Sequence, residues 1–273
     1  MTHLREAVVL ITGAAGGFGQ ELTRQLLKAG SRLILSDLEE VIVRKRAEVI
    51  WREVGTGDVI ACLGADLSSR EGCESLYRQV KALNVPVDIL INNAGIGLFG
   101  RMDEVPVEKW ERLMQVNLLA PMWLSSLVVA DMITRQKGHI VNISSVAGWV
   151  AWAGSAHYAA SKFALRGFSE GLFNEIKAHN LQVTAVYPYF SRTPILQSEG
   201  YGTLAENFQR FPEDMATDPS NVVREIIQGI VHNKLHVFPD PIAKIMHILK
   251  RYFPGLLNWL TNRLYSRLKS DAG

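Results

Sequence analysis

The sequence is poor in cysteine and has no strong excess of either charge. Its two cysteines, Cys62 and Cys73, show neither a CxxC motif nor a metal-binding spacing, so we expect buried free thiols in a reducing compartment. A formal net charge of +2 provides no overall field of the kind that nucleic-acid binding requires. The composition therefore predicts no metal site and no nucleic-acid partner.

Long apolar runs are also missing. Met1 and the next five residues lead straight into an apolar strand pattern, without the charged and then apolar segment of a signal peptide. No apolar run reaches the ~20 residues that a bilayer-spanning helix needs. We therefore expect a cytoplasmic protein. Its 273 residues, 48% of them apolar, are enough for one large α/β domain with a full core.

Short apolar runs alternate with helical patterns along most of the chain. Such runs are typical of buried parallel strands, and the helical patterns between them include 107–135 and 155–179. This alternation predicts an α/β fold: a single doubly wound parallel sheet of Rossmann type over residues 1–240, with about seven strands and helices on both faces. The expected strands are 7–12, 32–36, 59–63, 87–91, 138–143, 181–187 and 235–238.

A glycine-rich segment follows the first expected strand. Gly13, Gly17 and Gly19, with Phe18 between the last two, form a TGxxxGxG pattern that leads into a helix. Glycines there permit a tight turn and let the backbone approach a pyrophosphate group at the helix N-terminus. The pattern indicates a dinucleotide-binding unit.

Acidic residues follow the second and third strands. Asp37 lies where a carboxylate accepts hydrogen bonds from the adenosine ribose, or where it caps the next helix. A carboxylate there repels a 2′-phosphate, and neither Gly16 nor Leu38 supplies a compensating cation. This favours NAD over NADP. Asp66, followed by Leu67, is placed to contact the adenine or to cap the helix after it.

Tyr158 and Lys162 are four residues apart in a helical pattern, so their side chains point the same way. A neighbouring ammonium favours the phenolate, and we expect it to lower the tyrosine pKa from about 10. A tyrosine tuned in this way serves as a general acid and base. The alternative is an ordinary helix that happens to carry both residues.

Several polar and glycine residues come directly after expected strands, and parallel strands place their carboxyl ends at one sheet edge. The chain combines Thr12-Gly13-Ala-Ala-Gly-Gly17-Phe-Gly19, Asp66, Asn92-Asn93-Ala94-Gly95, Asn117, Ser145 and Tyr158-Ala-Ala-Ser-Lys162. In this combination, over residues 6–238, it resembles the short-chain dehydrogenase/reductase family.

The resemblance implies hydride transfer between a nicotinamide and a carbinol or carbonyl carbon. It implies Tyr158 as proton carrier, Lys162 as the residue that supports it and binds the nicotinamide ribose, Ser145 as donor to the substrate oxygen, and Asn117 as holder of a water next to Lys162. Ser145, thirteen positions before the tyrosine, is selected over Ser144. The implied cofactor contacts are Gly13, Gly17, Phe18, Gly19, Asp37, Asp66, Leu67, Asn93, Ala94, Gly95, Tyr158, Lys162, Pro188 and Thr193.

Two further properties follow from the resemblance. Family members are commonly homodimers or homotetramers that associate through the two long helices. The family usually has glycine after the proline that ends the sixth strand, whereas this chain has Tyr189. This departure removes no catalytic group, and we expect it to reshape the nicotinamide end of the site.

Aromatic residues flank the expected catalytic set. Trp149, Trp152, Tyr189 and Phe190 are candidates to line an apolar substrate pocket, with residues 189–218 as the substrate loop and 193–215 as a lid. They predict a bulky alcohol, aldehyde or ketone of steroid, retinoid or fatty type. The alternative for these aromatics is a place in the core or at a dimer contact. The alternative for the protein is a dinucleotide-sensing module or scaffold without turnover.

Residues 241–273 extend beyond the ordinary end of such a fold. Between 241 and 270 there are six basic residues and no acidic residue, and apolar residues recur at helical spacing on both sides of Pro254-Gly255. A basic amphipathic helix with aromatic residues is typical of peripheral membrane contact. The alternative is that its apolar face packs on the body or on a partner subunit.

Overall fold

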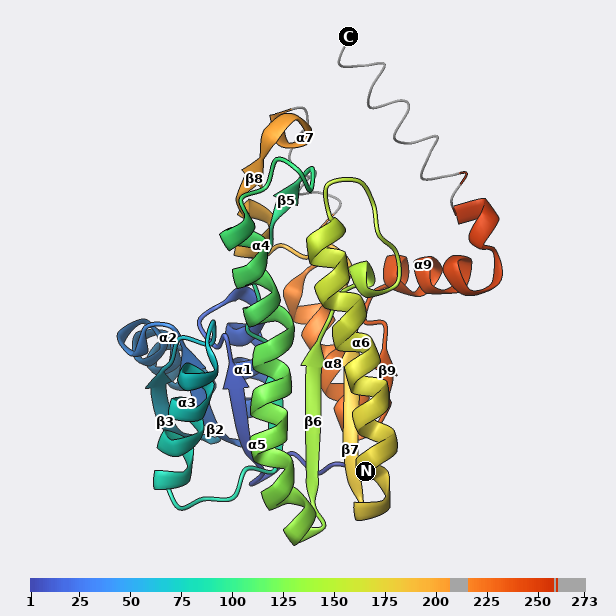
Figure 1. Ribbon diagram of the computed structural model, residues 1–273. Helices are drawn as coiled ribbons and strands as arrows, with labels where there is room; N and C mark the ends of the chain where they lie inside the picture. The colour runs from blue at the N-terminus through green and yellow to red at the C-terminus, as the bar shows by residue number, and fades with distance from the viewer. Residues whose placement is uncertain (207–215, 258, 260–273) are drawn as a thin grey trace.

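The structure, a computed structural model, describes residues 1–206, 216–257 and 259. A seven-stranded parallel sheet with the order β3-β2-β1-β4-β6-β7-β9 forms its centre (Figure 1). This confirms the predicted fold class, and each expected strand is present with small shifts at its ends. The strands are β1 Val8–Thr12, β2 Arg32–Asp37, β3 Asp58–Gly64, β4 Ile89–Asn92, β6 Gly138–Ile143, β7 Leu181–Val186 and β9 His236–Val237.

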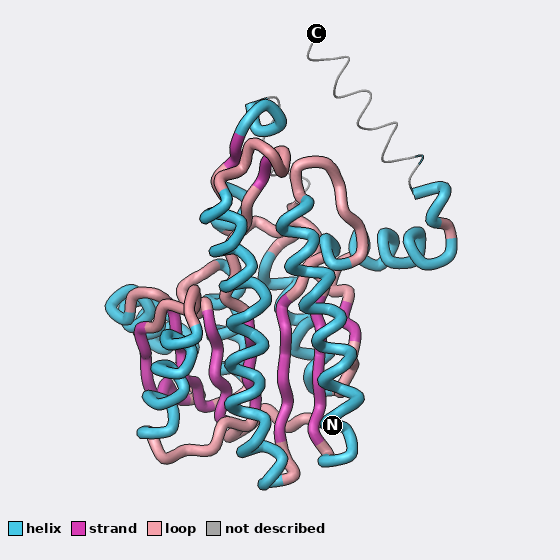
Figure 2. The backbone as a smooth tube through the Cα atoms, viewed as in Figure 1, coloured by secondary structure: helices cyan, strands magenta, loops and turns pink. Residues whose placement is uncertain are grey.

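Helices cover both faces of this sheet (Figure 2). Alternate strand residues point to opposite faces, so Val9 and Ile11 pack in one apolar cluster whereas Val8 and Leu10 pack in the other. The first cluster is completed by α1 Gly17–Lys28, α2 Glu40–Val54 and α8 Pro219–Val231. The second is completed by α3 Arg70–Ala82, α5 Ala120–Arg135 and α6 Ala156–Ile176. Both cysteines are buried free thiols in these clusters.

The long helical pattern at 107–135 is interrupted by a π-helical turn. Helix α4 Val107–Met114 is followed by the turn Gln115–Leu119 and then by α5. The whole segment is long and apolar enough to cross a membrane, but 56% of its most apolar window is buried. Because α5 contributes Leu124, Val128 and Met132 to the core, its apolar character is accounted for by packing on the sheet.

A second, two-stranded sheet stands beyond the carboxyl edge of the main one (Figure 1). Strand β5 Phe99–Gly100 pairs with β8 Gly200–Tyr201, and α7 Gly202–Glu206 follows. The described part of the expected substrate loop therefore contains regular structure, including a 3₁₀ turn at Pro194–Gln197. Shorter 3₁₀ turns occupy Val146–Gly148 and Lys177–His179. Positions 207–215 of the expected lid lie outside the described residues.

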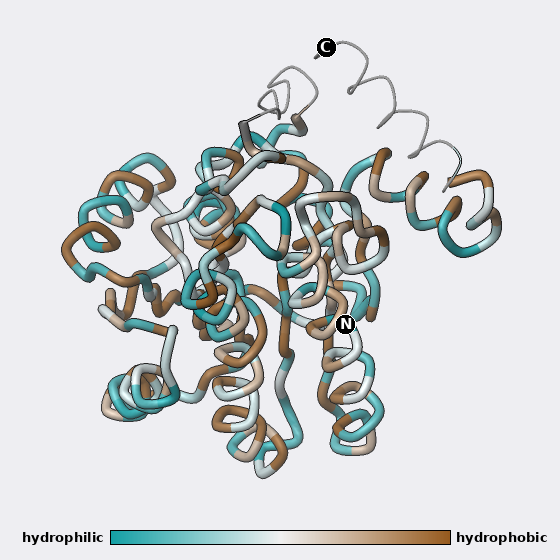
Figure 3. The backbone as a smooth tube through the Cα atoms, turned by 45° about the horizontal axis from the view of Figure 1, so that its top comes forward, coloured by the Kyte–Doolittle hydropathy of each residue, from teal (hydrophilic) through white to brown (hydrophobic). Residues whose placement is uncertain are grey.

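Helix α9 Pro241–Tyr252 leaves the body of the protein sideways (Figure 1). Asp240 caps it, because its carboxylate accepts a hydrogen bond from the Ala243 N–H at 2.8 Å. Hydrophobic and hydrophilic residues alternate along this helix (Figure 3). Most of the second helical piece expected in the tail lies outside the described residues.

Candidate active site

The glycine-rich segment folds against the segment that follows β4. A Cβ on Gly13, whose φ is +64°, would lie 2.7 Å from the Ala94 Cα. The Asn93 side-chain amide donates to the carbonyls of Thr12 at 3.0 Å and Gly13 at 2.9 Å. Gly19 packs just as tightly, with a Cβ position 2.1 Å from the Gly13 carbonyl oxygen. The result is a narrow backbone cradle at the start of α1 that fits a pyrophosphate group.

The same cradle touches the segment after β7. A Cβ on Gly17 would lie 2.6 Å from the Thr193 Cγ2. Two positions chosen as cofactor contacts therefore meet, although 176 residues separate them along the chain. Pro188, earlier in the same segment, accepts hydrogen bonds from the Val146 N–H at 3.0 Å and the Ser145 hydroxyl at 3.5 Å.

Asp37 supports the cradle and does not cap α2. One carboxylate oxygen accepts from the Ala15 N–H at 2.9 Å, and the other accepts from the Leu38 N–H at 2.8 Å. The N-cap position of α2 is Glu39, without a side-chain hydrogen bond. Arg46 of α2 donates to the carbonyl of Ala15, the residue whose N–H donates to Asp37. Sequence reasoning missed Arg46, because nothing in the pattern separates it from its basic neighbours.

Asp66 and Leu67 lie in different environments. The Asp66 carboxylate accepts from the Ser68 N–H at 2.9 Å, and this hydrogen bond lowers its pKa. Ser69, not Asp66, is the N-cap of α3. Leu67 is buried in the core. Asp66 itself remains exposed at the sheet edge, where an adenine contact is open to it.

Lys162 and Tyr158 point together into the carboxyl edge of the sheet from α6. The Lys162 ammonium lies 5.7 Å from the centroid of the Tyr158 ring and donates to the Ile143 carbonyl at 3.0 Å. The Ser145 hydroxyl lies between strand and helix, accepts from the Ala147 N–H at 3.1 Å, and hydrogen-bonds Tyr158. The Tyr158 ring is half-buried and packs against the apolar cluster that includes Leu98.

Burial controls the protonation of this group. It raises the pKa of Tyr158 to about 12, and the hydrogen bond from Ser145 acts in the opposite direction. It lowers the pKa of Lys162 to about 8, because the ammonium loses its hydration. The expectation that Lys162 brings the Tyr158 pKa below about 10 does not describe this structure. The loss of solvent around the phenol outweighs the opposing hydrogen bond from Ser145.

Asn117 lies in the π-helical turn with 1% of its surface exposed. Its Oδ1 accepts from the Ile96 N–H at 2.8 Å, and its Nδ2 donates to the Ile96 carbonyl at 2.9 Å. A Cβ on Gly95 would lie 3.3 Å from that Oδ1 and 3.7 Å from the Lys162 Nζ. Asn117 thus fixes the loop after β4 beside Lys162, which explains a polar residue in an apolar helix. Its water-holding role stays a prediction.

The four candidate substrate-lining aromatics separate into two groups. The Phe190 ring lies 4.9 Å from Tyr189 and 6.0 Å from Trp152, centroid to centroid. Trp149 is instead buried against Tyr187, at 5.8 Å, in a cluster on which the half-buried Trp152 also packs. For Trp149 the structure therefore favours the core alternative, because the side chain is buried in this cluster.

Asp240 is a second residue that sequence reasoning missed. Its carboxylate, 3% exposed, accepts from the Tyr189 N–H at 2.9 Å while it also caps α9. One side chain therefore joins the segment after β7 to the tail. A carboxylate just before Pro241 signals a helix cap, but its bond to Tyr189 has no signal in the sequence.

Similarity to known proteins agrees with this geometry. A family model described as short chain dehydrogenase matches residues 7–202. The human protein named epidermal retinol dehydrogenase 2 is 34% identical over 256 residues, which cover 92% of this chain and 80% of that one. The bovine 3-ketodihydrosphingosine reductase is 30% identical over 232 residues, covering 84% of this chain and 70% of the relative.

A solved structure shows the same fold over nearly the whole chain. It is a short-chain dehydrogenase from Sphingobium yanoikuyae in complex with NADPH, with a TM-score of 0.77 and 27% sequence identity. The alignment covers 95% of each chain.

Proposed function

The chain belongs to the short-chain dehydrogenase/reductase family of oxidoreductases, and on that premise we propose that it is an NAD(H)-dependent enzyme that interconverts apolar alcohols with ketones or aldehydes. The observation that carries this proposal is the meeting of Tyr158, Lys162 and Ser145 beside the glycine cradle. A nicotinamide dinucleotide supplies the hydride chemistry when bound. The cradle at Gly13, Gly17 and Gly19 would hold its pyrophosphate group, and the carboxylate of Asp37 would hold its adenosine ribose.

The residues of the chain handle the proton. Because burial keeps the Tyr158 phenol protonated at neutral pH, it is ready to donate a proton to the substrate oxygen in the reductive direction. The Ser145 hydroxyl donates a second hydrogen bond where negative charge develops on that oxygen. The Lys162 ammonium then stabilises the phenolate that remains, from across the 5.7 Å between the ammonium and the ring. Oxidation uses the same groups in reverse.

The choice of NAD is proposed from Asp37. Its carboxylate faces the position that the adenosine ribose takes in dinucleotide folds, where it repels an added phosphate. Arg46 weakens the argument against NADP, because it places a cation on the Ala15 carbonyl. The Sphingobium relative binds NADPH. Asp37 is nevertheless held by two backbone hydrogen bonds, one of them from Ala15 in the cradle, and we take the fixed charge as decisive.

An apolar substrate is proposed from the surroundings of Tyr158. Its ring packs beside the cluster of Leu98, Val105 and Leu113, and the Trp152–Phe190 pair follows on the neighbouring segments. Two relatives are named for action on retinol and on 3-ketodihydrosphingosine. We therefore propose the same class of reaction on a similar substrate for this chain.

A substrate panel tests this proposal. We expect change in NADH absorbance with long-chain, steroid or retinoid alcohols and ketones, and at least about tenfold lower kcat/KM with short hydroxy acids, because a charged group loses its hydration in an apolar pocket. Activity confined to small charged substrates would contradict the substrate class. Cofactor binding without turnover anywhere in the panel would favour the alternative, a dinucleotide-sensing module or scaffold.

The pH profile of reduction gives a second test. Tyr158 stays protonated up to a pKa of about 12, whereas Lys162 loses its charge above a pKa of about 8. We therefore expect the reduction rate to be level near neutral pH and to fall above about pH 8 as the ammonium deprotonates. Lys162→Arg keeps its charge at high pH, so in that variant the fall in reduction rate should begin at a higher pH. If the fall in rate begins at the same pH in both proteins, deprotonation of Lys162 is not its cause.

We further propose a cytoplasmic homodimer or homotetramer that contacts a membrane peripherally through residues 241–273. The two alternatives for this tail apply to different faces of α9. Ala243, Met246 and Leu249 face the body or pack against the Trp149 cluster, while Ile245 and Ile248 are exposed. The face that does not pack is the one proposed to meet lipid.

A further inference from the structure

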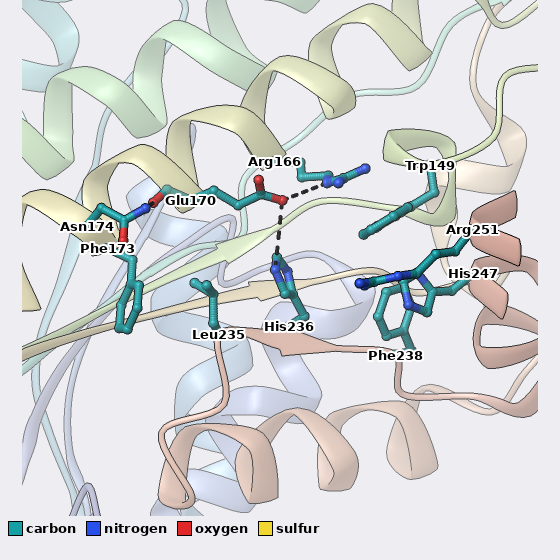
Figure 4. Close-up of a pocket in the computed structure, with 10 residues that line it drawn as sticks. All are labelled: Trp149, Arg166, Glu170, Phe173, Asn174, Leu235, His236, Phe238, His247 and Arg251. Atoms are coloured by element: carbon teal, nitrogen blue, oxygen red, sulfur yellow. Dashed lines mark hydrogen bonds and ion pairs between the residues drawn. The ribbon is translucent and has the colours of Figure 1, made fainter.

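A cavity of about 350 Å³ lies between α6, β9 and α9, and none of the candidate catalytic residues lines it. Figure 4 shows cationic and aromatic side chains pointing into it from all three elements. Its lining residues are Trp149, Arg166, Glu170, Phe173, Asn174, Leu235, His236, Phe238, His247 and Arg251. The proposed reaction has no use for this combination of groups.

Two guanidinium groups face the cavity with donors to spare. That of Arg166 stacks on the Trp149 ring, 3.3 Å from its centroid, and its Nε donates to Glu170 at 2.8 Å. Among the described residues, no hydrogen bond engages its two terminal nitrogens, and Arg251 has neither a hydrogen bond nor an ion pair. Since Glu170 is the single acid in the lining, the cavity carries an excess of positive charge.

Two histidines complete the polar side of the cavity. His247 packs against Phe238 at 4.2 Å and Trp149 at 4.3 Å between centroids, and its Nδ1 is buried with no partner among the described residues. The Nε2 of His236 lies 3.8 Å from Glu170. Burial lowers the pKa of both imidazoles, and the arginine charges lower them further. Neutral imidazoles next to guanidinium nitrogens that have no partner among the described residues leave a site suited to an anion that accepts hydrogen bonds.

The exposed face of α9 adjoins this cavity. Ile245, Ile248 and Tyr252 follow helical spacing and are 55%, 49% and 64% exposed. His247 and Arg251 each precede a member of this stripe by one position, so the cavity lining and the stripe occupy neighbouring faces of one helix. An apolar stripe beside a cationic site is the arrangement expected where hydrocarbon and an anionic headgroup meet.

We propose that this cavity binds the phosphate group of an anionic phospholipid while the stripe of Ile245, Ile248 and Tyr252 enters the bilayer interface. Guanidinium groups match phosphate oxygens in geometry and charge. A bilayer is the source because the stripe adjoins the cavity and because residues 241–270 hold six basic and no acidic residues. The inference deepens the proposed membrane contact, and its test measures lipid binding rather than turnover, so either proposal can fail alone.

The test compares two variants of the full-length protein by co-sedimentation with vesicles of phosphatidylcholine alone or mixed with phosphatidylglycerol. Arg251→Gln removes a charge that lines the cavity, whereas Lys250→Gln removes the same charge one position away, outside the lining. We expect binding only to the mixed vesicles, weakened about tenfold by Arg251→Gln and about twofold or less by Lys250→Gln. Unchanged thermal unfolding temperatures would show that both variants fold.

A titration with glycerol phosphate separates the two sources of phosphate. We expect it to shift the imidazole proton signals of His247 and His236 weakly and to compete with the mixed vesicles. Equal losses of vesicle binding in the two variants would show that binding comes from diffuse attraction to the surface charge and not from the cavity. Tight binding of glycerol phosphate with no vesicle binding would assign the cavity to a soluble phosphate ligand and overturn the lipid proposal.

Discussion

Tyr158→Phe is expected to lower turnover by about a thousandfold while NADH binding stays within a few fold of that of the unaltered protein. The substitution removes one hydroxyl and keeps the ring that packs beside Leu98. Since the phenol carries the proton in both directions, its loss blocks proton exchange and leaves the glycine cradle intact. The measurement is NADH absorbance with the best substrate of the panel, together with NADH fluorescence for binding.

Tyr201→Phe is the matched control. Tyr201 packs in the same apolar cluster as Tyr158, but its hydroxyl donates to the exposed Glu199 at 2.5 Å. Its removal should leave turnover within about twofold, because a surface hydrogen bond contributes little. Near-full activity of Tyr158→Phe on a confirmed substrate would show that Tyr158 is not the proton carrier.

The second large effect concerns cofactor choice. Asp37→Asn should shift the ratio of kcat/KM for NADPH to that for NADH by about thirtyfold toward NADPH. The amide keeps the size of the side chain but removes the charge that repels a 2′-phosphate, and it weakens the acceptors offered to the ribose hydroxyls. The measurement is initial rate against cofactor concentration for both dinucleotides, in the unaltered protein and the variant.

Arg46 makes this experiment sharper. Its guanidinium reaches the Ala15 carbonyl, next to the N–H that donates to Asp37. If it supplies the cation for a 2′-phosphate, adding Arg46→Gln to Asp37→Asn should reverse most of the gain with NADPH, whereas Arg46→Gln alone should barely alter NADH use. A preference for NADPH in the unaltered protein that Asp37→Asn leaves unchanged would show that Asp37 does not select the cofactor.

Much of the fold could be read from the sequence. The seven strands of the main sheet are apolar runs, because parallel strands are buried on both faces and tolerate few polar side chains. The short strands β5 and β8 could not be predicted in this way. Each has two residues, and they form only because segments about a hundred residues apart are brought together.

The same division holds at the candidate site. A spacing of four residues places Tyr158 and Lys162 on one face of a helix in any context. The direction in which burial moves the Tyr158 pKa depends on the whole surrounding structure, and it opposed the expectation drawn from Lys162 alone. Asp240 and Arg46 were missed for the same reason: each acts on a backbone group far away in the sequence.

The tail shows where sequence reasoning ends. Its basic, amphipathic character was determined by residue order, because helical spacing alone sorts apolar from charged side chains. Which side chains face solvent, and that His247 and Arg251 share a cavity with Arg166, was decided by how α9 packs on the Trp149 cluster. Periodicity is a local property of the chain. The pairing of faces depends on contacts between distant segments, and only the tertiary structure determines those.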